Sequence, residues 1–117
     1  MPSERVPDAL AGILENAVAA QDFILGLDLD AFLSDRRTLY AVTRCLEIIS
    51  EASRRVDDDV RAHYPQIPWR QIADAGNVYR HQYKSVTADM IWLVARDRMA
   101  DLVTMCRAEL VRPPENS

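Results

Sequence analysis

Residues 67–83 read IPWRQIADAGNVYRHQY, and the other helical segments are expected to form the scaffold that holds this stretch. It holds one of the two histidines, one of the two tryptophans and two of the four tyrosines. Asp74 is the only acid among its basic neighbours, which are Arg70, Arg80, His81 and Lys84. Pro68 is well placed to start a helix, because a first helical turn leaves its N–H groups unpaired and proline has none. The stretch therefore predicts a basic helix that carries the chemistry.

Length and composition indicate one all-α domain spanning residues 1–117. The chain is 49% hydrophobic and contains only three glycines, which favours helices. Apolar residues recur at helical spacing in four segments. These run from Asp8 to about Leu25, from Ser34 or Asp35 to about Val56, from Pro68 onward, and from Thr87 to about Val111. With a connector at 27–33 and a short extra turn at 60–64, the pattern predicts an antiparallel bundle of four main helices.

Charge and cysteine usage favour a soluble, cytoplasmic protein. The net charge is −4, so any nucleic-acid contact must rest on a local positive patch. Cys45 and Cys106 lie inside helical patterns without metal-site spacing, which indicates buried free thiols in a reducing compartment. The acidic run 57–59 suits a helix N-terminus better than a metal site. Residues 1–7 and 112–117 are expected to be flexible tails, and no apolar run is long enough to span a bilayer.

The central stretch can bring an amide, a guanidinium and an imidazole to one surface. On a helix, Asn77 shares a face with His81, four residues on, and meets Arg80, three residues on. An imidazole can move a proton near neutral pH, and a guanidinium can hold a phosphate. These groups suit cleavage of RNA by its own 2′-hydroxyl, without a metal or cofactor. Tyr79 and Tyr83 are available to stack on bases.

A structural explanation stands beside this chemical one. A lone histidine on a helix is more often a capping or half-buried polar residue than a catalyst. Trp69 is expected in the core, and His63, next to the acidic run, is expected on the surface. Gly76 weakens the predicted helix and indicates either a bend or a close approach of the backbone to a neighbour.

Three pieces of the chain resemble the HepT-like branch of the HEPN superfamily, and the resemblance extends from about Ala9 to Arg107. The first is residues 39–52, similar to the second-helix signature of the family. The second is residues 64–73, similar to its link into the third helix. The third contains Asn77, His81 and Tyr83, which match the active-site motif Arg-Asn-(three residues)-His-x-Tyr. The three occur in order and at the spacing of the family.

The resemblance implies a helical bundle that dimerises and places two motif copies at a shared cleft. It implies a toxin that cleaves RNA without a metal, with the motif arginine and histidine as its catalytic pair. Its partner would be a minimal nucleotidyltransferase antitoxin, which in some members transfers AMP to the motif tyrosine. Carried over, His81 is the catalytic histidine, Asn77 its polar neighbour and Tyr83 the modification site. Neither DNA nor a membrane is an expected partner.

One position departs from the motif, because Gly76 stands where the arginine should be. Arg80 is the nearest basic side chain, and an arginine of a second subunit is another possible substitute. Other candidates for phosphate or RNA binding are Arg70, Arg44 and Lys84. Three alternatives remain. The first is a toxin that cleaves RNA. The second is an impaired relative that does not cleave but binds its partner, a nucleotide or RNA, and the third is a helical dimerisation domain with no site.

Overall fold

The computed structural model describes residues 5–81 and 87–113, and within these ranges the regular structure is entirely helical. The predicted all-α class is therefore confirmed. The helices are α1 (Arg5–Ile24), α2 (Leu29–Leu33), α3 (Arg36–Ser53), α4 (Asp58–His63), α5 (Trp69–His81), α6 (Ala88–Asp97) and α7 (Met99–Val111). None of the helices in the described part of the chain is long and apolar enough to cross a membrane.

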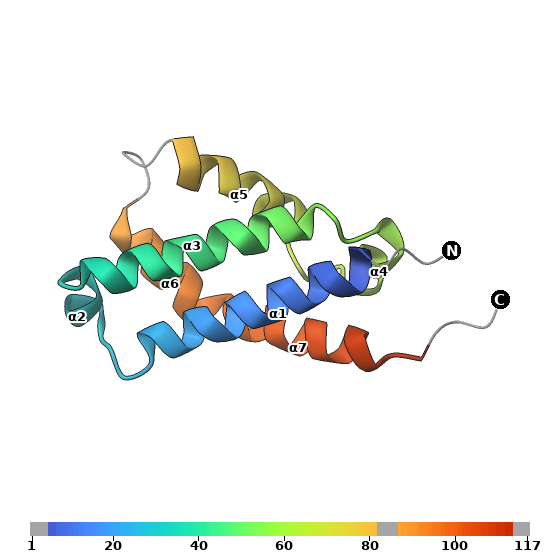
Figure 1. Cartoon of the computed structure of the whole chain (residues 1–117), viewed down its shortest axis with the longest axis horizontal. Coiled ribbons are helices and arrows are strands. Elements are labelled where there is room, and N and C mark those ends of the chain that lie inside the picture. Colours follow the sequence, from blue (N-terminus) through green and yellow to red (C-terminus); the bar gives the residue numbers. More distant parts are fainter. Residues whose placement is uncertain (1–4, 82–86, 114–117) are drawn as a thin grey trace.

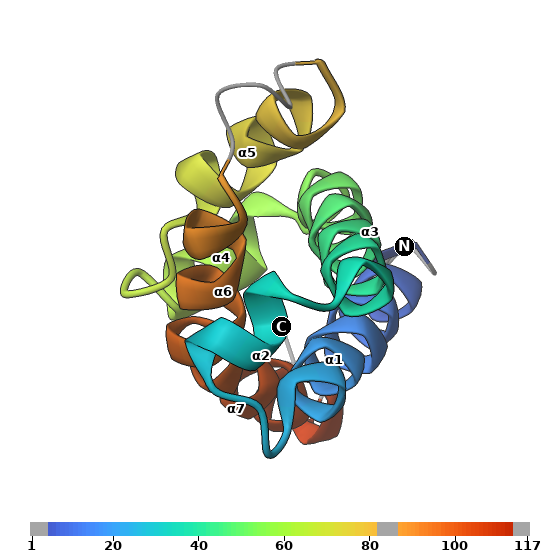
Figure 2. The same cartoon turned by 90° about the vertical axis from the view of Figure 1, so that its left-hand side faces the viewer.

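The long helices α1, α3 and α7 form the body of the molecule (Figure 1). α1 packs against both α3 and α7, while α6 contacts α1, α2 and α3. The main contact of α5 is with α3. Figure 2 shows α5 at one edge of the molecule, away from α1 and α7. The orientation of α5 therefore depends chiefly on how it sits on α3.

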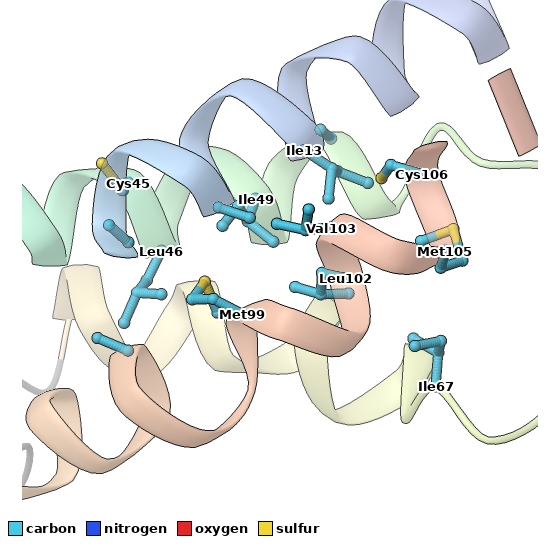
Figure 3. Packing of buried hydrophobic residues seen from close by; sticks show 14 of the residues in the cluster. Ile13, Cys45, Leu46, Ile49, Ile67, Met99, Leu102, Val103, Met105 and Cys106 are labelled. Atoms are coloured by element: carbon cyan, nitrogen blue, oxygen red, sulfur yellow. The ribbon is translucent and has the colours of Figure 1, made fainter. Parts of the chain in front are cut away.

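The core lies between α1, α3 and α7. Figure 3 shows Leu46 and Ile49 of α3 close to Met99, Leu102 and Val103 of α7, all of them buried. Burying one such side chain stabilises the fold by about 1.5–3 kcal/mol. The two cysteines are free and buried in this core, as the sequence predicts. Burial raises the pKa of the Cys106 thiol to about 12.

Local sequence signals predict several helix starts correctly. The Asp35 carboxylate accepts hydrogen bonds from the Thr38 N–H at 3.1 Å and the Thr38 hydroxyl at 2.7 Å. Asp57 accepts from the N–H of Val60 at 3.0 Å, so the acidic run is a helix N-terminus. The Thr87 hydroxyl caps α6 by accepting from the N–H of Met90 at 3.4 Å.

Other predicted boundaries are wrong. α1 begins at Arg5, so Asp8 lies in its first turn instead of capping it. α5 begins at Trp69, one residue after Pro68. The expected connector 27–33 contains the short helix α2, because the Asp28 carboxylate caps it by accepting from the N–H of Ala31 at 2.8 Å.

The last predicted helix is divided at Arg98 into α6 and α7. Residues 88–111 contain neither glycine nor proline, so no helix-breaking residue in this segment predicts the break. Tertiary packing accounts for it. Trp92 of α6 packs on Phe32 of α2, with ring centroids 5.3 Å apart, whereas α7 lies along α1. A change of direction lets each half bury its own apolar face (Figure 1).

Candidate functional site

Polar contacts of Ser50 and Arg54 fasten α5 to α3. The Ser50 hydroxyl donates to the carbonyl oxygen of Ala73 and accepts from the backbone N–H of Gly76, each at 3.0 Å. Arg54 donates to the same Ala73 oxygen through Nη2 at 2.7 Å and Nε at 3.3 Å. The two helices therefore meet at Ala73 and Gly76, where small residues allow the α5 backbone to come close.

Gly76 is buried at this contact, and α5 continues through it without a break. Of the two expectations for this glycine, the close backbone approach is confirmed. The position that carries arginine in the family motif thus faces α3 in this chain. A long side chain at residue 76 would begin inside the α3–α5 contact instead of in solvent.

Asn77, the next residue, is exposed on the outer side of α5. Residues 70, 74, 77 and 81 are spaced so that they form one stripe along the helix. Asp74 and Arg70 are also exposed. Arg70 precedes His81 by eleven residues, about 16 Å along the axis, which is too far for both to bind one phosphate.

His81 and Arg80 form the last residues of α5, and the structure describes their backbone but not their side chains. Tyr83 and Lys84 lie outside the described residues. For the three residues predicted to be catalytic, Asn77, Arg80 and His81, the structure therefore shows only their spacing along one helix.

Arg44 of α3 lies level with this end of α5. The two helices run in opposite directions (Figure 1), so moving back along α3 from Ser50 matches moving forward along α5 from Gly76. Arg44 is six residues before Ser50, about 9 Å along the axis, and Arg80 is four residues after Gly76, about 6 Å along its own axis, so the two differ in height by about 3 Å. Its side chain is 69% exposed and pairs with Glu47 at 3.5 Å.

Tyr79 lies on the side of α5 opposite to Asn77. It lines a groove of about 230 Å³ together with Ile49, Ile72 and Leu102, and polar side chains also line this groove. Burial raises the pKa of its hydroxyl. Two residues along a helix correspond to about 200°, so Tyr79 faces away from Asn77. Tyr79 therefore lies off the stripe formed by Asn77 and His81, and its predicted availability to stack on bases stays a prediction.

The remaining predicted residues have structural roles. Trp69 is half-buried against the core, and its Nε1 donates to the carbonyl oxygen of Tyr64 at 3.1 Å. His63 is exposed on α4, with Nδ1 2.7 Å from the carbonyl oxygen of Asp59. Sequence reasoning missed Ser50 and Arg54, because their partners on α5 are 19 to 26 residues away in the chain.

In the described residues, an all-helical bundle with an Asn-x3-His pair at the end of α5 is consistent with the HEPN class. The profile of the family Ribonuclease HepT-like matches residues 13–109. The chain therefore belongs to the HepT-like ribonuclease family.

Curated relatives agree with this assignment. A Thermococcus cleftensis protein named Probable ribonuclease HepT is 33% identical over 95 residues, covering 81% of this chain and 86% of the relative. Two Methanocaldococcus jannaschii proteins that carry provisional RNase names are also similar. The first is 32% identical, and the match covers 83% of this chain and 89% of the relative. The second is 37% identical, and the match covers 79% of this chain and 76% of the relative. No solved structure matches the chain significantly.

Proposed function

We propose that the chain is a metal-independent ribonuclease toxin that cleaves RNA at the Asn77–His81 end of α5. The observation that carries the proposal is the spacing of Asn77, Arg80 and His81 on one unbroken helix whose outer face is exposed. Membership of the HepT-like ribonuclease family supports the choice of RNA as the substrate.

The chemistry needs only the substrate and these side chains. The 2′-hydroxyl oxygen attacks the adjacent phosphorus, and the bond from phosphorus to the 5′-oxygen breaks. His81 moves the proton from the 2′-hydroxyl toward the departing 5′-oxygen. Arg80 and Asn77 hold the phosphate and stabilise its added negative charge. The products are a 2′,3′-cyclic phosphate and a free 5′-hydroxyl.

Expression of the chain without a partner gene tests this function. Wild type should stop growth and leave cleaved cellular RNA, and His81→Ala should do neither. His63→Ala is the matched control, because His63 is an exposed histidine on α4 outside the site. Undiminished toxicity of a folded His81→Ala protein would contradict the proposal.

Gly76 supports a second candidate, an impaired relative that binds a nucleotidyltransferase, a nucleotide or RNA without cleavage. Removing a donor that stabilises transition-state charge commonly costs about 10²- to 10³-fold in rate. This candidate predicts that wild type is harmless when expressed alone and still copurifies with a nucleotidyltransferase partner. Strong toxicity of the lone chain counts against it.

We further propose that the toxin works as a cytoplasmic homodimer and that a minimal nucleotidyltransferase silences it through Tyr83. The Tyr83 hydroxyl oxygen would attack the α-phosphorus of ATP, with release of diphosphate. Incubation with the partner and ATP should add the mass of AMP to wild type but not to Tyr83→Phe. Tyr40→Phe is the control, because Tyr40 is 63% exposed on α3. Modification that persists in Tyr83→Phe would move the site, with Tyr79 the next residue to test.

A further inference from the structure

We infer that Ser50 is a positioning residue for the ribonuclease site: its hydroxyl fixes the rotation of α5 on α3, and so the direction in which Asn77 and His81 project. The inference rests on the proposed function for its catalytic consequence. Its structural part stands on the hydrogen bonds between the two helices alone.

The Ser50 hydroxyl bridges two backbone groups of α5. It donates to the Ala73 carbonyl and accepts from the Gly76 N–H, each at 3.0 Å, and the residue is only 1% exposed. A hydroxyl has one hydrogen to donate, and here that hydrogen goes to the Ala73 carbonyl while the hydroxyl oxygen accepts from Gly76. The hydroxyl therefore both donates to α5 and accepts from it. Because the Ser50 side chain is almost fully shielded from water, water competes little for its hydroxyl, and the two bonds together favour one rotation of α5.

The bridge lies directly beside the catalytic segment. Gly76 immediately precedes Asn77, and His81 follows little more than one turn later. Side-chain tips lie about 5–6 Å from a helix axis, so a 20° rotation of α5 would move them by about 2 Å. A misplacement of about 1 Å can reduce catalysis by about a hundredfold.

Few other contacts could replace the bridge. α5 lies at the edge of the molecule, and α3 is its main neighbour (Figure 2). Arg54 reaches the same Ala73 carbonyl, but its side chain is exposed and water competes for its bonds. The apolar residues of α5 determine which face of the helix turns toward the core, and the two directional hydrogen bonds of Ser50 narrow the rotation within that range.

Ser53 provides a matched control on the same helix. It is also 1% exposed, but its hydroxyl donates to the Ser50 carbonyl at 2.7 Å, within α3. Replacing it with alanine removes a buried hydroxyl of the same size without touching α5. A difference between the two alanine variants therefore reports the bridge and not the general loss of a buried polar group.

The test combines steady-state RNA cleavage with hydrogen exchange of the α5 amides in wild type, Ser50→Ala and Ser53→Ala. Ser50→Ala should lower kcat by about tenfold or more with little change in KM, because the site is displaced and not removed. Amides of residues 76–81 should exchange faster in Ser50→Ala than in Ser53→Ala. If Ser50→Ala does not fold, Ser50→Cys leaves no cavity, has a weaker hydrogen-bonding group, and replaces it in both measurements.

Two results separate this inference from the proposed function. Equal amide exchange, or equal kcat, in the Ser50 and Ser53 variants overturns the positioning role. Absence of cleavage by folded wild type overturns the proposed function instead, and the exchange comparison still decides whether Ser50 holds α5.

Discussion

Gly76 and Arg80 lie four residues apart on the unbroken helix α5, so they occupy the same helix face, about 40° apart. The chain therefore lacks an arginine at the motif position but carries one a single turn further on, next to His81. The buried contact of Gly76 with Ser50 explains why the motif position itself is not free for a long side chain.

Arg80 should supply the positive charge that the motif normally places at residue 76. We predict that Arg80→Ala lowers kcat for RNA cleavage by about 10²- to 10³-fold, the usual effect of losing a transition-state donor. Arg107→Ala is the control, since Arg107 is exposed on α7. Equal kcat values for the two variants would exclude Arg80 from the site.

Restoring the motif arginine should not help this chain. Gly76→Arg places a long side chain in the buried α3–α5 contact, and such overpacking typically costs about 1–3 kcal/mol. We predict a lower melting temperature and no gain in RNA cleavage. A variant with wild-type stability and higher activity would show that the α3–α5 contact can accommodate an arginine at residue 76, contrary to the burial of Gly76.

Arg44 is expected to bind the RNA backbone beside the site without taking part in the chemistry. Arg44→Ala should raise KM, leave kcat nearly unchanged and weaken the salt dependence of RNA binding. Arg55→Ala is the matched control, because Arg55 is also an exposed, ion-paired arginine but lies beyond the far end of α3. A similar change in KM for both variants would show that the change comes from the lower net charge of the protein and not from the position of Arg44.

The other end of the bundle should contribute stability that depends on pH. Hydrogen bonds from Arg112, then one from Tyr64, hold the pKa of Glu109 below its ordinary value of 4.5, while burial opposes them. A lowered folded-state pKa stabilises the protein above the unfolded value, and this contribution is lost as pH falls through the folded value. Glu109→Gln should therefore flatten the decline of unfolding free energy below about pH 4.5, as measured by urea titrations. If the unfolding free energy of Glu109→Gln declined below about pH 4.5 as steeply as that of wild type, the prediction would be wrong.

The sequence predicts those features whose signals are local. Asp35 and Thr87 identify helix starts because a cap bonds only three residues ahead. The helical period correctly places Asn77 on an exposed face, and the same period turns Tyr79 about 200° away from it, into the groove. The break at Arg98 and the Ser50 bridge could not be predicted, because each depends on a partner that only the folded chain brings near.

Cleavage of RNA by the purified chain in the presence of a metal chelator tests the central claim most directly. Wild type and His81→Ala would be compared at equal concentration, with the ends of the products identified. The account predicts that wild type cleaves RNA and leaves 2′,3′-cyclic phosphates, while folded His81→Ala leaves it intact. Intact RNA with folded wild type, or equal cleavage by both proteins, would contradict it.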